Sequence, residues 1–136
     1  MTSIYEQFET DTTSETEGIV LDYGDAGWIK CARAGGANKR YQKALEKFGR
    51  RYRRQLELNI LPEEVATKNL IGIYADTIIL EGEVIGKDKK KVILKGNRKA
   101  VVDLFTDLPE LFRDVRDQTS GAEQFKSSER EEEAKN

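Results

Sequence analysis

Apolar residues recur at helical spacing through part of the first half of the chain. They fall at i, i+3, i+4, i+7, i+11 and i+15, one stripe over about four turns, and they are Tyr41, Ala44, Leu45, Phe48, Tyr52 and Leu56. Basic side chains fill most of the remaining circumference, namely Lys39, Arg40, Lys43, Lys47, Arg50, Arg51, Arg53 and Arg54. The pattern predicts a long basic amphipathic helix over residues 39–54. Gly49 weakens its middle by about 1 kcal/mol relative to alanine and marks the place for a kink.

Segments rich in β-branched and aromatic residues predict two β-hairpins. The first covers residues 18–34, where GIVLDYG and WIKCARAG flank a turn at Gly24-Asp25-Ala26-Gly27. Glycine and aspartate supply the positive φ angles that a tight connection needs. The second joins TIILEGEVIG to KDKKKVILKG, with its turn at residues 86–89. Gly35-Gly36 separates the first hairpin from the basic helix.

Three more helices are predicted from start signals followed by apolar residues. Pro62, Glu63 and Glu64 begin a helix that runs to Tyr74 or Asp76, because proline and acidic residues suit a first turn. Gly96 or Asn97 opens a short helix. A last helix starts at Asp107-Leu108-Pro109-Glu110, with the Asp107 carboxylate predicted as its cap. The apolar residues of the two short helices are Val101, Leu104, Phe105, Leu111, Phe112 and Val115.

These elements define an α+β protein with one small domain. The order is N-terminal β-hairpin, long basic helix, second helix, second β-hairpin and two short C-terminal helices. Residues 1–17 are polar and acidic and are predicted to be a flexible arm. Residues 18–120 form the α+β domain, and residues 121–136 are predicted to be a disordered charged tail, since they lack apolar periodicity apart from Phe125.

Composition excludes several classes of function. The chain of 136 residues has no histidine and one cysteine. Histidine-based triads, histidine metal sites and an intramolecular disulfide are therefore excluded. No apolar run approaches the roughly 18 residues of a membrane span, and the acidic N-terminus lacks the apolar core of a signal peptide. We expect a cytosolic protein without a membrane segment.

Charge is segregated into blocks along the chain. Residues 1–25 hold seven acidic residues and no basic one, whereas residues 30–54 hold ten basic residues and one acidic one. The basic block suits nucleic acid, an acidic protein partner or the chain's own acidic segments. No helix-turn-helix, zinc-finger or RNP motif accompanies it, and Tyr41 and Tyr52 lie on the apolar stripe. We favour an acidic protein partner for the eight cations of residues 39–54, with nucleic-acid binding as the alternative.

No pattern nominates a catalytic site. Cys31 lies mid-strand without a histidine to activate it, and Lys30 and Arg33 alternate to the other strand face. The stretch Gly35-Gly36-Ala37-Asn38 precedes a helix, but it lacks the P-loop and dinucleotide-binding spacings and is better interpreted as the junction between hairpin and helix. Calcium-loop spacing is absent as well. We therefore expect no catalytic residue, cofactor or metal, and a protein that is not an enzyme.

Several segments, taken in order, resemble a known family. They are SIYEQFETD, LDYGDAGWIKCARAGGANKRYQKALE, IYADTIIL and LFTDLPELFRDV, and they span about residues 3–125. The most specific are Ala32–Asn38 at the junction with the basic helix and Phe105–Phe112. Together they resemble the small tail assembly chaperones of long-tailed, non-contractile phages and prophages.

The resemblance implies a non-enzymatic role in virion morphogenesis. Such chaperones bind the long, helical tape measure protein, keep it soluble and help tail-tube subunits assemble around it. They act in the host cytoplasm and are absent from the mature virion. The family often makes a longer form by ribosomal frameshift, and the terminal Ala134-Lys135-Asn136 permits a slippery coding sequence. Self-association is expected too, because exposed apolar grooves often close on a second copy.

Overall fold

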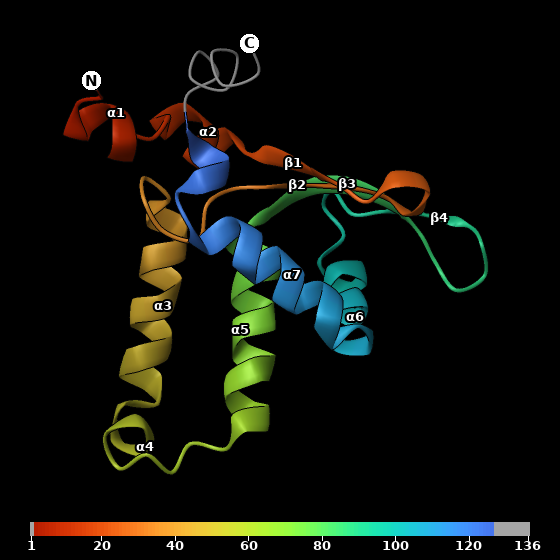
Figure 1. Cartoon of the computed structure of the whole chain (residues 1–136). Helices are drawn as coiled ribbons and strands as arrows, with labels where there is room; N and C mark the ends of the chain where they lie inside the picture. Colours follow the sequence, from red (N-terminus) through yellow and green to blue (C-terminus); the bar gives the residue numbers. More distant parts are fainter. Residues whose placement is uncertain (1, 127–136) are drawn as a thin grey trace.

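The computed structural model describes residues 2–126 and confirms the α+β class (Figure 1). A four-stranded sheet lies at one side, and the longer helices lie below it in the view of Figure 1. In chain order the elements are α1 (Ile4–Phe8), α2 (Thr12–Glu17), β1 (Ile19–Asp22), the 3-10 turn η1 (Gly24–Ala26), β2 (Gly27–Cys31), α3 (Lys39–Arg51), α4 (Arg53–Glu57), α5 (Glu63–Thr77), β3 (Ile79–Ile85), β4 (Lys91–Ile93), α6 (Arg98–Asp107), α7 (Pro109–Ser120) and the 3-10 turn η2 (Glu123–Phe125).

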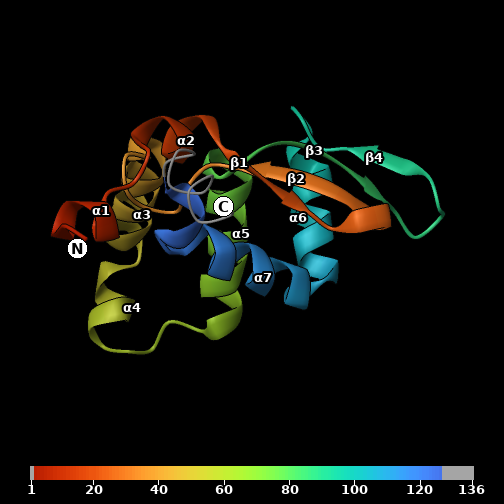
Figure 2. The same cartoon turned by 45° about the horizontal axis from the view of Figure 1, so that its top comes forward.

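Both predicted hairpins are confirmed, and they join into one antiparallel sheet in the order β1-β2-β3-β4 (Figure 2). The sequence patterns did not indicate that β2 would pair with β3. That pairing includes an irregularity between Lys30 and Cys31. It also requires glycine at position 27, because a Cβ there would clash with the carbonyl oxygen of Glu83 and φ is +128°.

The core lies between the sheet and the helices α5, α6 and α7. Its aromatic centre is Tyr74, whose ring meets Phe112 edge to face at a centroid distance of 5.3 Å. Phe112 also contacts Phe105 at 5.1 Å, and both phenylalanines are buried. Tyr41 of α3 meets Tyr74 edge to face at 5.8 Å, which ties the basic helix to the core. Such pairs add about 0.5–1.5 kcal/mol each beyond their buried area.

The basic helix is shorter than predicted. α3 ends at Arg51, and Tyr52 adopts φ −110° and ψ 20° before the separate helix α4 begins. The break is therefore at Tyr52 and not at Gly49. The break coincides with a contact to another helix, since the Tyr52 side chain turns toward α5, where its hydroxyl accepts a hydrogen bond from Asn69 Nδ2 at 3.4 Å. Leu56, predicted to continue the apolar stripe, is instead 44% exposed.

The N-terminal residues are helical rather than extended. Asp11 caps α2 by accepting a hydrogen bond from the Thr13 N–H, and its own N–H donates to the Phe125 carbonyl at 2.7 Å. Glu15 of α2 is 2% exposed and pairs with Arg33. The prediction of a flexible arm missed these contacts because their partners lie 18 and more residues away along the chain.

The C-terminal side of the fold also extends further than predicted. Residues 121–126 include η2, and the Phe125 side chain is completely buried. A single apolar residue without periodicity gave no sequence signal for this anchor. The rest of the predicted tail, residues 127–136, lies outside the described residues.

The predicted cap of the last helix is wrong, whereas the other helix starts are confirmed. Asp107 is the final residue of α6, so its backbone is helical and does not suit the cap position. α7 follows Leu108 directly, with Pro109 in its first turn and no side-chain cap. Of the two residues predicted to open α6, Gly96 and Asn97, it is Asn97 that caps the helix, by accepting a hydrogen bond from the Ala100 N–H.

Candidate functional site

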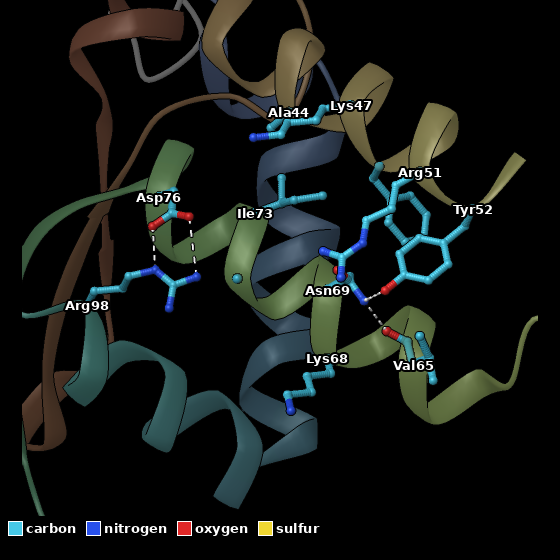
Figure 3. Close-up of a pocket in the computed structure, with 12 residues that line it drawn as sticks. Ala44, Lys47, Arg51, Tyr52, Val65, Lys68, Asn69, Ile73, Asp76 and Arg98 are labelled. Carbon is cyan, nitrogen blue, oxygen red and sulfur yellow. Dashed lines mark hydrogen bonds and ion pairs between the residues drawn. The ribbon is translucent and has the colours of Figure 1, made fainter.

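A groove of about 760 Å³ runs between α3 and α5 (Figure 3). The two helices lie side by side in an antiparallel hairpin that α4 closes at its far end (Figure 1). The groove is lined by Ala44, Lys47, Phe48, Arg51, Tyr52, Val65, Lys68, Asn69, Gly72, Ile73, Asp76 and Arg98. We call it the α3–α5 groove.

The junction before α3 fixes the spacing of the two helices. The Asn38 side chain is buried, and its Oδ1 accepts a hydrogen bond from the Tyr41 N–H, which caps α3. Its Nδ2 donates to the carbonyls of Arg33 at 2.9 Å and Thr77 at 3.1 Å. One side chain therefore ties the start of α3 to the end of α5. With these contacts, residues 35–38 form the junction between the first hairpin and α3.

Polar and apolar groups contribute about equally to the walls of the groove, and its apolar side chains come from both helices. Phe48 and Ala44 come from α3, and Val65 and Ile73 come from α5. Gly72 leaves space beside them, since a Cβ at this position would lie 3.0 Å from a guanidinium nitrogen of Arg98. A glycine within α5 therefore lets a cation from α6 lie against the same groove.

The rim is cationic. Lys47, Arg51, Lys68 and Arg98 line the groove, against the single carboxylate of Asp76. Arg98 binds both Asp76 oxygens, at 2.6 and 3.3 Å, and these contacts raise the pKa of Arg98 above its ordinary value. Within residues 2–126, the other three cations make no ion pair. The groove therefore keeps a positive charge for an anionic ligand.

The eight cations predicted as a partner-binding surface do not all face the same site. Lys47 and Arg51 line the α3–α5 groove, and the Arg51 guanidinium lies 5.3 Å from the Tyr52 ring centroid. Arg40 donates to the Asp76 carbonyl at 2.8 Å, and Arg53 pairs with Glu57 at 3.1 Å. The six cations outside the groove lining are exposed, and they are Lys39, Arg40, Lys43, Arg50, Arg53 and Arg54.

Two rim cations were missed by sequence reasoning. Lys68 and Arg98 come from α5 and α6, whose sequences carry no run of basic residues. Their contribution depends on the packing of three helices, which no local pattern encodes. Gly72 in the middle of a helix was the one available signal, because a helical glycine costs about 1 kcal/mol relative to alanine and suggests a close approach.

An apolar tip continues the helical hairpin beyond the groove. Leu56, Leu58 and Ile60 are 44, 56 and 62% exposed, and they lie in and after α4. α4 follows directly on Tyr52, one of the groove residues (Figures 1 and 3). We call Leu56, Leu58 and Ile60 the apolar tip. Exposed apolar side chains beside a groove are candidates for an interaction surface.

Cys31 is positioned as a core residue and not as a nucleophile. Its side chain is completely buried, and burial raises the pKa of the thiol to about 12. We expect native protein to resist alkylation at mildly alkaline pH and denatured protein to react fully, as measured by intact mass. Rapid labelling of the native protein would contradict this burial.

The raised thiol pKa also sets a pH dependence. The unfolded thiol ionises near 9.0 and the folded one near 12, so its contribution to stability is full below pH 9 and is lost as pH rises toward 12. Burial also raises the pKa of Tyr23 and Tyr74. The difference between wild type and Cys31→Ala in urea unfolding at several pH values isolates the thiol, and a pH-independent difference would contradict the assignment.

Across residues 2–126, no helix combines the length and the apolar character that crossing a membrane requires. In the same residues, cysteine, aspartate and glutamate side chains do not gather in a group of three that a metal would need.

Comparison with known proteins places the chain among prophage proteins. Residues 36–136 match the family model described as YdaY prophage protein, which covers well over half of the chain. The chain therefore belongs to the YdaY prophage protein family. The matched region includes α3, α4, α5 and α6 and every residue that lines the α3–α5 groove. No curated protein and no solved structure matches the chain.

Proposed function

We propose that this prophage protein is a tail assembly chaperone that binds helical segments of the tape measure protein in the α3–α5 groove. The observation that carries the proposal is the groove itself, a cleft between two helices that combines apolar side chains with three cations that lack an ion pair among the described residues. The family membership supports a prophage origin, and the resemblance of residues 3–125 to tail assembly chaperones supports this particular role.

The groove suits an amphipathic helix as its ligand. A helix that lies between α3 and α5 would bury its apolar face against Phe48, Val65 and Ile73, as in helix-in-groove recognition. Acidic residues on its flanks would meet Lys47, Arg51 and Lys68. Rim charges of this kind raise the association rate and make the complex sensitive to salt. Reversible binding is what a chaperone that releases its client requires.

The apolar tip extends the contact along a long client. A tape measure protein is a very long helical protein, so a single groove covers only a short part of it. The exposed Leu56, Leu58 and Ile60 would contact the client beyond the groove. In this proposal the chaperone keeps the client soluble in the host cytoplasm, recruits the tail-tube protein, leaves before the virion matures and performs no catalysis.

Nucleic-acid binding is the alternative, favoured by the six exposed cations outside the groove lining. The two tyrosines of residues 39–54 are poorly placed to stack on nucleic-acid bases. Tyr41 is packed against Tyr74, and Tyr52 packs on Phe48 at 5.1 Å and bonds to Asn69. Neither ring is free to stack on a base, which single-strand binding normally uses.

An affinity pull-down separates the two functions. The tagged full chain is expressed together with the structural operon of its prophage, and bound proteins are identified by mass spectrometry with and without nuclease. We expect recovery of the tape measure protein, and of the tail-tube protein, unaffected by nuclease. Recovery of nucleic acid, or loss of every partner on nuclease treatment, would overturn the chaperone proposal.

A further inference from the structure

The helix α1 exposes an apolar face. Ile4, Tyr5 and Phe8 are 64, 75 and 69% exposed, although the helix is well formed and capped. Ser3 and Glu6 make a reciprocal capping box. A helix of five residues is too short to be stable by its backbone hydrogen bonds alone, so its apolar side chains are expected to contact another surface.

α1 is held away from the closed end of the helical hairpin. Asp11 is fixed by its hydrogen bond to Phe125, and α2 is fixed by the pair of Glu15 with Arg33. Only Glu9 and Thr10 lie between α1 and this anchor. In Figures 1 and 2, α1 projects beyond α2, whereas α4 closes the opposite end of the hairpin. The exposed face of α1 is therefore presented outward to another molecule.

Two of the grooves in the described part of the chain could admit a short helix. One is the α3–α5 groove. The other, of about 580 Å³, lies between α5, α6 and α7, and its charged residues are Glu63, Glu64, Lys68, Arg113 and Arg116. The mixed charges of this second groove give no preference for an acidic ligand.

The charge of α1 matches the α3–α5 groove. The segment around α1 carries Glu6, Glu9 and Asp11 and no basic residue. The α3–α5 groove has four cations against one carboxylate, and that carboxylate is already paired with Arg98. Ile4 and Phe8 are one helical turn apart, so both can contact the apolar side chains of a groove between two helices.

We infer that two copies of this chain associate, each placing α1 in the α3–α5 groove of the other. The exchange is reciprocal, so it closes as a dimer instead of growing into a filament. The association itself does not depend on the proposed function. Its consequence, that α1 and the client compete for one groove, does rest on that function.

The experiment is sedimentation velocity on the full chain over a wide range of concentrations. We expect wild type to reach twice the mass of the 15.5 kDa chain. Ile4→Ser/Phe8→Ser and Lys47→Glu/Arg51→Glu should each weaken the dimer by more than about tenfold. The matched control Lys43→Glu/Arg50→Glu changes the same charges on α3 outside the groove lining and should leave the dimer intact.

A charge swap tests the pairing directly. Glu9→Lys should weaken the dimer, and combining it with Lys47→Glu should restore it, while Glu6 stays in place because it forms the capping box of α1. All substituted side chains are exposed, so circular dichroism and melting should show an unchanged fold. A wild type that stays monomeric, or a dimer that survives both the α1 and the groove variants, would overturn the inference. Loss of the dimer on removal of residues 127–136 would also overturn the inference, because the ligand of the groove would then be the acidic stretch Glu131–Glu133 and not α1.

Discussion

Glu15→Ala is expected to lower the free energy of unfolding by about 3–5 kcal/mol, the cost of removing one partner from a buried ion pair. The Glu15 side chain is 2% exposed and accepts hydrogen bonds from Arg33 Nη1 and from the Thr10 hydroxyl, the latter at 3.0 Å. Arg33 is itself only 18% exposed. Without Glu15 its guanidinium would remain partly buried and uncompensated, and its Nε already lacks a partner in the structure.

Urea unfolding followed by circular dichroism measures this effect. Glu17→Ala provides the matched control, because it removes the same group from the same helix at an exposed position and should change stability by less than about 0.5 kcal/mol. Replacing both partners, as in Glu15→Leu/Arg33→Met, should recover much of the loss, since no charge is left unpaired. A loss below about 1 kcal/mol for Glu15→Ala would show that α2 does not anchor the N-terminal segment.

Reversing the groove charges is the second change with a large expected effect. Lys47→Glu/Arg51→Glu/Lys68→Glu replaces three cations of the groove with carboxylates. None of these three makes an ion pair within residues 2–126. Each reversal removes an attraction of about 0.5–1 kcal/mol with an acidic helix and adds a repulsion. Together they should weaken binding of an acidic amphipathic segment of the tape measure protein by about a hundredfold or more.

Isothermal titration calorimetry with such a segment measures the change. Lys39→Glu/Lys43→Glu/Arg50→Glu carries the same total charge change outside the groove lining, and it should weaken binding far less. Wild-type affinity should fall as salt is raised, whereas the residual binding of the groove variant should not. Equal losses in the two triple variants would mean that net charge, and not the groove, determines binding.

Local patterns were sufficient to predict the elements with strong periodicity or turn chemistry. The stripe from Tyr41 to Phe48 predicted α3, and the glycine turns predicted both hairpins. Pro62 and Asn97 marked the starts of α5 and α6. These features depend on residues close together in the chain, where the period of apolar positions and the backbone preferences of single residues act directly.

The features that were not predicted depend on distant contacts. α2 is stabilised by Arg33, and the last turn is anchored by the burial of Phe125. The break at Tyr52 follows from a contact with α5. The same holds for the candidate site, because half of the cationic rim comes from Lys68 and Arg98 on other helices. The eight cations predicted from the sequence include Lys47 and Arg51, which line the groove. The sequence does not distinguish these two from the six cations outside the groove lining.

The measurement that tests the central claim most directly is the solubility of the full-length tape measure protein on co-expression. It would be expressed alone, with the wild-type chain, with Lys47→Glu/Arg51→Glu/Lys68→Glu and with Lys39→Glu/Lys43→Glu/Arg50→Glu. We expect the client to be soluble with wild type and with the second variant, and insoluble alone and with the groove variant. A client that is equally soluble with the groove variant, or insoluble with wild type, would contradict the account.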